Sequence, residues 1–146
     1  MYKQCLLLAG AIALAGCANE PSNEQARLAT GAPTSPELAA YAAAHPYPEK
    51  AQASDHLRAA AIVNRADGVI KIYNFDNRPI QDANVWVNRS FVQHINGIAP
   101  NSSAIVRFGQ LYNGMGKSFS SLNEPVSTVQ VDMGNNLYTL EGPAAE

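Results

Sequence analysis

The chain has 146 residues, and its 10 Lys and Arg face 12 Asp and Glu, which gives a net charge of −2. This length accommodates one domain at most, and the lack of a basic excess argues against nucleic acid as a partner. Because the chain has only two cysteines, it cannot be a scaffold held by several disulfides.

The first seventeen residues have the layout of a secretory signal. A basic start containing Lys3 runs into an apolar stretch at residues 5–14, and the stretch ends in Leu-Ala-Gly-Cys at positions 14–17. A membrane-spanning helix needs roughly 20 apolar residues, and this stretch is much shorter. The pattern therefore predicts a cleaved signal peptide at residues 1–16.

Small residues before the cleavage point and a cysteine directly after it resemble the lipobox of bacterial lipoproteins. The resemblance implies cleavage between Gly16 and Cys17, a diacylglyceryl group on the Cys17 sulfur and an N-acyl chain on the new amino terminus. Two or three acyl chains anchor a protein stably in membrane lipid, because each buried methylene contributes about 0.8 kcal/mol. Ala18 stands where an Asp retains Gram-negative lipoproteins in the inner membrane. The expected location is therefore the bacterial cell envelope, with the periplasmic face of the outer membrane favoured in a Gram-negative host.

Maturation would leave a chain that depends on its core alone. Lys3 and Cys5 leave with the signal and Cys17 is acylated, so 130 residues remain, with nine basic against twelve acidic residues and a net charge of −3. The exported compartment permits disulfides, but no free thiol is left to form one.

Residues 17–56 are predicted to form a lipidated stalk. They are rich in Ala and Pro, and five of the nine prolines fall between Pro21 and Pro48. A segment of this composition cannot bury enough apolar surface to fold by itself. The stalk is expected to be flexible and to lift the folded domain away from the lipid.

One short helix is expected inside the stalk, at residues 36–45. Ser35 suits the N-cap, Pro36 the first helical position, and Glu37 complements the positive helix end. Ten residues are few for an isolated helix, so Leu38 and Tyr41 need a surface on which to pack.

From residue 58 onward the hydrophobic period changes to two, which is the period of half-buried strands. Asp67-Gly68 is a two-residue hairpin signal between the first two strands. The expected strands are residues 59–65, 69–75, 83–87, 91–98, 104–108, 126–133 and 137–140.

The sequence therefore predicts an all-β fold at residues 57–142, followed by a tail at 143–146. The expected architecture is a small antiparallel β-sandwich, immunoglobulin-like and of about seven strands. An open barrel is the alternative. Twelve apolar side chains alternate along the strands as the expected core: Ile70, Ile72, Val85, Val87, Phe91, Ile95, Val106, Phe108, Val129, Val131, Leu137 and Leu140.

A second resemblance covers roughly residues 69–120. The strand at 69–75 has the pattern apolar-x-apolar-x-Asn that ends at Asn74, positions 85–88 read Val-Trp-Val-Asn, and positions 98–103 read Ile-Ala-Pro-Asn-Ser-Ser. These motifs resemble a pattern in small bacterial lipoproteins of unassigned function. This chain has Pro100-Asn101 where a Gly is frequent, and both make turns. The resemblance implies an immunoglobulin-like sandwich in the envelope and brings no catalytic residues with it.

Positions 114–118, Gly-Met-Gly-Lys-Ser, imitate the end of a nucleotide-binding P-loop. The full motif needs a glycine five residues before the Gly-Lys pair, and counting back from Gly116 gives Leu111. No helix is expected to follow that could hold a phosphate at its N-terminus. The segment is predicted to form a turn, and no nucleotide is expected.

The histidines His45, His56 and His94 lack the spacing of a metal site. His94 alternates with Val92 and Asn96, which predicts a solvent-facing or edge position on its strand. No metal or other cofactor is expected, apart from the lipid on Cys17.

Hydrolase chemistry has little support in the sequence. There is no Gly-x-Ser-x-Gly elbow, and nothing in the spacing of Ser90, His94 and Asp82 demands a catalytic triad. The protein is therefore expected not to be an enzyme.

The aromatic side chains offer a possible binding face. If Val85 and Val87 point inward, Asn84, Trp86 and Asn88 point to the opposite side, where an exposed tryptophan between asparagines would suit a binding surface. Two alternatives remain: the stalk helix covers Trp86, or a bulge shifts the phase and Trp86 belongs to the core.

These observations favour a membrane-anchored, non-enzymatic module that binds or scaffolds an envelope component, either a protein or a glycan. The alternative is a small envelope hydrolase or metal-binding protein that uses His94 and nearby carboxylates.

Overall fold

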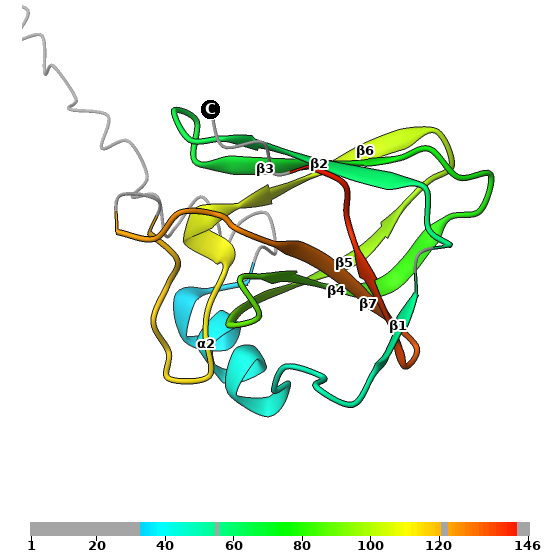
Figure 1. Ribbon diagram of the computed structural model, residues 1–146. Helices are drawn as coiled ribbons and strands as arrows, with labels where there is room; N and C mark the ends of the chain where they lie inside the picture. Colours follow the sequence, from blue (N-terminus) through cyan, green and yellow to red (C-terminus); the bar gives the residue numbers. More distant parts are fainter. Residues whose placement is uncertain (1–32, 55, 121–122, 143–146) are drawn as a thin grey trace, which may run out of the picture. The chain divides into compact units, whose positions relative to one another are not determined.

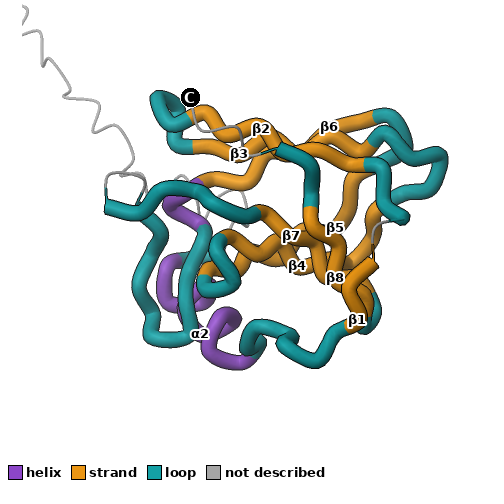
Figure 2. The backbone as a smooth tube through the Cα atoms, viewed as in Figure 1, coloured by secondary structure: helices purple, strands orange, loops and turns teal. Residues whose placement is uncertain are grey.

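The computed structural model describes residues 33–54, 56–120 and 123–142 (Figures 1 and 2). The predicted signal peptide, the cleavage between Gly16 and Cys17, the lipidation of Cys17 and the tail at 143–146 lie outside the described residues. Within the described ranges, no helix is long and apolar enough to cross a membrane.

Two β-sheets face each other across the core (Figure 1). The larger sheet has five strands in the order β1-β8-β7-β4-β5, and the smaller has three in the order β2-β3-β6. The all-β sandwich prediction is confirmed, with eight strands in place of about seven. The strands are β1 (Gln52–Ser54), β2 (Ala59–Asn64), β3 (Val69–Asn74), β4 (Ile80–Val87), β5 (Phe91–Ile98), β6 (Ser102–Arg107), β7 (Val129–Met133) and β8 (Asn136–Thr139).

The strand order is that of an immunoglobulin-like sandwich. Counted from β2, the first, second and fifth strands form the smaller sheet, and the third, fourth, sixth and seventh form the larger. The chain therefore changes sheet after β3, after β5 and again after β6. The fourth strand, β5, pairs with the third, as the C′ strand of variable-type domains does, and does not join the first, second and fifth strands as in constant-type domains. The extra strand, β1, pairs parallel to β8 at the edge of the larger sheet.

The main core lies between the two sheets. Ile70 and Val106 of the smaller sheet belong to the same buried cluster as Val85 and Val131 of the larger. Because side chains alternate between the two faces of a strand, the period seen in the sequence is enough to place them. All twelve predicted core residues are buried, eleven in this cluster and Leu137 in a second one.

The turn of the β2–β3 hairpin is longer than predicted. Asn64 pairs with Val69, so residues 65–68 form a four-residue loop instead of a two-residue Asp67-Gly68 turn. Asn64 Oδ1 accepts a hydrogen bond from Asp67 N at 3.1 Å, and Gly68 takes a φ of 63°. The side chain of Asn64 thus stabilises a wider loop than the dipeptide alone indicates.

Asn74, at the end of β3, is fully buried and ties together the turns that follow β3 and β5. Its Nδ2 donates to the carbonyl oxygens of Arg78, Ile98 and Ala99 at 2.8, 3.2 and 3.3 Å. Its Oδ1 accepts from Asp76 N at 3.0 Å. A buried amide needs such partners, so the asparagine of the strand motif has a structural role.

The predicted short helix is present as α2 (Ser35–Ala44), one residue earlier than expected. Thr34, and not Ser35, is the N-cap. Thr34 N and Oγ1 both donate to Glu37 Oε2, at 2.7 and 2.9 Å, as part of a capping box. A short 3-10 helix, η1 (Phe108–Gln110), follows β6.

Helix α2 packs on the outer face of the larger sheet, close to β5 (Figures 1 and 2). Leu38 and Ala42 on the helix join Trp86, Val92 and Leu137 on the sheet in the second buried cluster. The domain therefore has two apolar layers, one between the sheets and one between the larger sheet and the helix.

The predicted stalk is wrong for residues 33–54, which belong to the folded domain. Besides α2, the segment contains β1, whose Gln52 pairs with Asn136, and Tyr47, whose hydroxyl donates to Gln130 Oε1 at 2.9 Å. Alanine and proline dominate the composition and concealed the few apolar side chains that fit a sheet face. Residues 17–32 lie outside the described residues, so the stalk remains a prediction there.

Removing the chain before Gln52 is therefore expected to lower the melting temperature of the domain. The deletion removes α2 and exposes the only tryptophan, Trp86, to water. Thermal unfolding followed by circular dichroism should show the loss of stability. The emission of Trp86 should move to longer wavelength and become accessible to an aqueous quencher.

A point variant tests the same contact in the full chain. Leu38→Ala should destabilise the domain by about 2–3 kcal/mol, the lower part of the range for buried leucines, whereas Ala40→Ser on the exposed side of α2 is the control. Equal stability of the truncated and full chains would contradict the packing role of the helix.

Candidate functional site

The face on which the sequence predicted a binding site is covered. As expected, β4 points Val85 and Val87 into the core and Trp86 to the opposite side. Trp86 is nevertheless only 3% exposed, because α2 packs on it and the ring of Tyr47 meets it edge-on at a centroid distance of 5.2 Å. The prediction of an exposed Trp86 is wrong, and the alternative that the helix covers it is confirmed.

The two asparagines of that predicted face hold the fold together. Asn84 Oδ1 accepts a hydrogen bond from the Tyr41 hydroxyl at 2.6 Å. Asn88, in the β4–β5 turn, accepts from Ser127 N and donates to Pro125 O, at 2.8 and 2.7 Å. Asn84, Trp86 and Asn88 therefore do not form a free surface.

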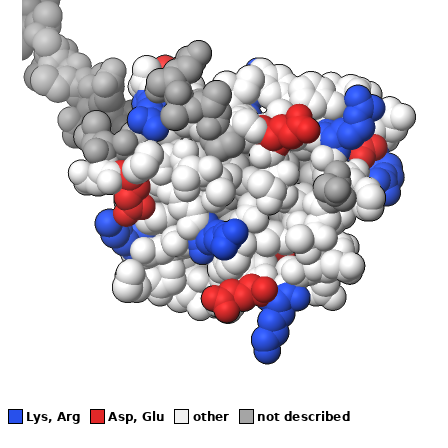
Figure 3. Space-filling view, viewed as in Figure 1, with Lys and Arg blue, Asp and Glu red and all other residues white. Residues whose placement is uncertain are grey.

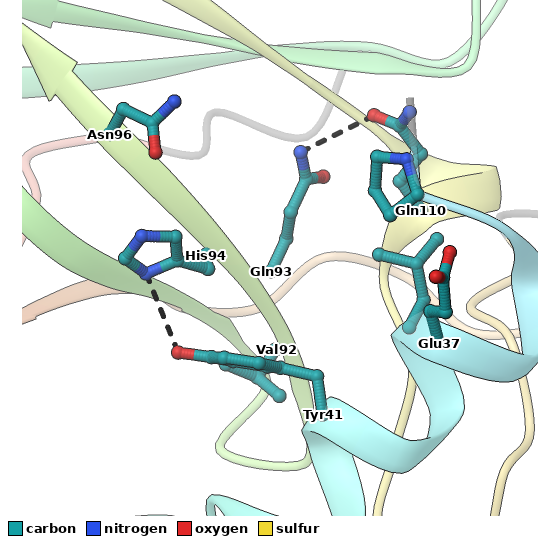
Figure 4. Close-up of a pocket in the computed structure, with 9 residues that line it drawn as sticks. Glu37, Tyr41, Val92, Gln93, His94, Asn96 and Gln110 are labelled. Carbon is teal, nitrogen blue, oxygen red and sulfur yellow. Dashed lines mark hydrogen bonds between the residues drawn. The ribbon is translucent and has the colours of Figure 1, made fainter. Parts of the chain in front are cut away.

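A groove beside His94 is the better candidate. It has a volume of about 460 Å³ and lies between α2 and β5. Figure 4 shows side chains from both elements around it. β5 is an edge strand of the larger sheet, which confirms the edge position predicted for His94. The polar residues that line the groove are Glu37, Tyr41, Gln93, His94, Asn96 and Gln110.

Polar contacts connect the two walls of this groove. The Tyr41 hydroxyl, which donates to Asn84, also lies 3.4 Å from His94 Nδ1 (Figure 4). His94 Nε2 lies 3.5 Å from Asp82 Oδ1. The side chain of Asp82 is 93% exposed, so water screens this contact and it adds little stability. The contacts mainly orient the imidazole and phenol rings.

Asp82 has a φ of 47° within β4. This left-handed conformation is unfavourable for most residues, although Asp tolerates it better than most. On β5, Gly97 is required, because a Cβ there would lie 2.8 Å from the carbonyl oxygen of Ile80. The distorted strand pair positions the carboxylate of Asp82 beside His94.

The groove has both a protonated phenol and an ionised carboxylate at neutral pH. Burial raises the pKa of Tyr41, and the carboxylates of Asp82 and Asp132 raise it further, against the lowering effect of the bond to Asn84. Hydrogen bonds from Thr34 lower the pKa of Glu37. On the face shown in Figure 3, basic and acidic side chains are interspersed, with no large area of one sign.

The residues considered for hydrolysis are not assembled into a triad. Ser90 precedes His94 by four residues along an extended strand, which separates them by about 13 Å, and its hydroxyl donates to Asn88 O at 3.2 Å. Asp82 is the carboxylate that does lie beside His94. His56 lines a different pocket, with Asp76. Within the described ranges, no group of three or more His, Cys, Asp or Glu residues could hold a metal ion.

The segment that imitates a P-loop is a turn, as predicted. Asn113 Oδ1 accepts hydrogen bonds from the backbone N–H groups of Met115 and Lys117 at 3.1 and 2.9 Å. Gly116 has a φ of 77°, and Lys117 Nζ pairs with Glu124 at 3.2 Å. The N–H groups that would contact a phosphate in a P-loop are used inside the turn.

Comparisons of this chain with protein-family models, curated proteins and solved structures found no match. Function therefore has to be inferred from the groove. The sequence predicted a solvent-facing or edge position for His94 from its alternation with Val92 and Asn96, but it gave no reason to place Tyr41 and Gln110 beside them. Those two residues come from α2 and η1, which only the tertiary packing brings to β5.

Lowering the pH is expected to loosen the N-terminus of α2. The pKa of Glu37 is lower in the folded than in the unfolded chain, so its stabilising effect is fully present above the unfolded value and is lost as the pH falls through the folded value. The measurement is the melting temperature against pH. Glu37→Gln should remove this acid-dependent component, whereas Glu49→Gln, an exposed glutamate outside the helix, should keep it. Identical profiles of melting temperature against pH for wild type and Glu37→Gln would contradict the stabilising role of the Glu37 carboxylate.

Proposed function

We propose that this protein is a membrane-anchored envelope lipoprotein whose β-sandwich binds another envelope component, a protein segment or a glycan, without catalysing a reaction. The anchor is supported by the sequence Leu-Ala-Gly-Cys at positions 14–17, with the diacylglyceryl and N-acyl lipid on Cys17. The favoured location is the periplasmic face of the outer membrane. The binding role is supported by the groove between α2 and β5.

One buried polar atom beside the groove supports the binding proposal. Gln93 Nε2 donates to Gln110 Oε1 at 3.3 Å, but Gln93 Oε1 is buried and accepts no hydrogen bond from the described residues. Buried polar atoms without a partner are few in native proteins, and each one needs an explanation. A ligand N–H or O–H group that draws the Gln93 side chain toward the groove would provide the missing donor.

The remaining lining fits a polar ligand of modest size. The side chains of Asn96 and Gln110 offer amide donors and acceptors, and Tyr41 offers an aromatic ring beside them. Amides pair with hydroxyl and peptide groups, and aromatic rings pack on apolar faces. The volume of about 460 Å³ falls in the usual range of ligand sites. A few sugar units or an extended peptide segment would satisfy these groups.

The anchor can be tested by metabolic labelling with palmitate. Cys17→Ser should abolish labelling and leave the precursor uncleaved, because the sulfur that receives the lipid is gone. Cys5→Ser is the matched control and should label normally, because Cys5 leaves with the signal peptide. Palmitate in the Cys17→Ser protein, or wild-type protein that is soluble after lysis, would contradict the anchor.

Binding in the groove can be tested by photo-crosslinking in cells. A crosslinking residue at the exposed, groove-lining position Asn96 should capture a discrete product, whose mass shows whether it contains a peptide or a glycan. The same residue at Arg89, in the β4–β5 turn, is the control.

The amide of Gln93 can be tested in the same experiment. Gln93→Leu, which removes the unpaired acceptor at similar volume, should lower the yield from position 96 about fivefold to tenfold, as expected for one hydrogen bond to a ligand. Gln81→Leu on the exposed side of β4 should leave the yield unchanged. Equal products from positions 96 and 89, or no product from either, would contradict the groove as the binding site.

A further inference from the structure

The outer face of the smaller sheet is open, in contrast to the helix-covered outer face of the larger sheet. Alternation along β2, β3 and β6 directs Ile62, Lys71 and Ile105 outward, and strand pairing places them side by side in one row. Ile62 is 57% exposed, Ile105 52% and the nearby Phe75 50%. Large apolar side chains gathered on an exposed sheet face indicate a contact surface.

Aromatic and basic groups complete this surface. The rings of Tyr73 and Phe75 are stacked with centroids 5.9 Å apart, and Lys71 Nζ lies 4.7 Å from the centroid of Tyr73. Arg107 points to the same side as Ile105, two residues along β6.

The charged residues on the strands of this surface are basic. In the sequences of β2, β3 and β6, the charged residues are Lys71 and Arg107, both basic, and no Asp or Glu occurs. The whole chain, by contrast, has an acidic excess and a net charge of −2. One acidic residue, Glu141, borders this face, because it pairs with Ala60 at the edge of β2 and lines a pocket with Phe75. The outer face of the smaller sheet therefore combines apolar and aromatic groups with two cations, and its carboxylate lies at the edge.

We propose that this outer face of the smaller sheet rests against the anionic phospholipid surface of the membrane that holds the Cys17 anchor. The inference rests on the proposed anchoring. Interfacial contacts with lipid combine apolar side chains that enter the headgroup boundary, aromatic rings at the same depth, and cations that attract anionic headgroups. All three kinds of group lie together on this face.

The anchor brings this face within reach of the lipid. Fifteen residues separate Cys17 from Pro33, and a chain of that length extends about 55 Å at most. Tethering turns docking into an intramolecular step with a high effective concentration. Two cations and three exposed apolar side chains are too few to recruit a free protein to lipid stably. They suffice to orient a protein that is already anchored. A soluble protein partner has no comparable support, because the tether holds the domain near lipid and does not concentrate such a partner.

The test uses the acylated protein in vesicles. Because Cys17 is lipidated and Cys5 is removed, Ser103→Cys introduces the only free thiol, on the exposed outer face of β6 next to Ile105. An environment-sensitive fluorophore on this thiol should shift to shorter wavelength and resist iodide quenching in phosphatidylcholine vesicles that contain phosphatidylglycerol. The control label replaces Met115, which is 88% exposed and lies in the turn near α2. It should remain open to iodide.

Charge variants test the cause of the protection. Lys71→Gln with Arg107→Gln should lower the protected fraction of the label, with about a fivefold weaker docking equilibrium for each cation removed. Lys50→Gln with Arg89→Gln removes the same charge away from this face and should change nothing. Vesicles of phosphatidylcholine alone should reproduce the weakened docking.

The outcomes separate the inference from the anchoring on which it rests. Vesicle flotation is measured first, and protein that fails to float would overturn both the anchor and the docking. Floating protein with equal quenching at positions 103 and 115 would overturn the docking alone. Protection at position 103 that appears only after envelope proteins are added would assign the surface to a protein partner and overturn the lipid contact.

Discussion

The packing of α2 on Trp86 is the contact on which the outer layer of the larger sheet and the candidate groove depend. A buried tryptophan removes about 150–250 Å² from water, worth about 4–6 kcal/mol, whereas an exposed polar contact such as that of His94 with Asp82 contributes at most about 1 kcal/mol. The apolar contact therefore holds the helix, and the polar contacts only orient side chains. Without the helix, the groove would lose the wall that contains Glu37 and Tyr41. The packing of α2 on the larger sheet thus forms the candidate groove and also buries Trp86, which the sequence predicted to be exposed.

The sequence predicted the parts of the fold that depend on the alternation of apolar and polar residues along a strand. It did not predict the contacts between segments that are distant in the sequence. Alternation placed Val85 and Val131 in the core and Trp86 on the opposite face, and all three positions are confirmed. A period of two defines which face a residue is on, but it holds no information about what covers that face. The covering helix came from a segment whose composition indicated a stalk, because few apolar residues are needed to cover one sheet face. The groove could not be predicted from the sequence for the same reason, because Gln110 and Tyr41 meet β5 only in the folded chain.

Asparagines show why residue type alone could not identify the site. Asn74, Asn88 and Asn113 each use their side chains to hold backbone groups of turns, with both the amide nitrogen and oxygen engaged in Asn74 and Asn88. In the sequence, Asn88 beside a tryptophan resembled a ligand contact. In the fold its side chain restrains the segment at residues 125–128 through hydrogen bonds to the backbone. Gln93 is the informative exception, because its oxygen has no partner among the described residues.

The two proposed surfaces lie on opposite sides of the sandwich, and this arrangement has a mechanical consequence. The open face with Ile62 and Ile105 belongs to the smaller sheet, whereas the groove lies on the outer side of the larger sheet. A domain that rests on lipid through its smaller sheet would therefore present the groove away from the membrane, toward the aqueous space of the envelope. Lipid docking would restrict rotation about the tether and keep the groove facing its ligand. Restricted rotation lowers the entropy that the domain loses when it binds a ligand. A weak contact between lipid and the smaller sheet would therefore raise the affinity of the groove for its ligand, although the lipid does not contact the groove.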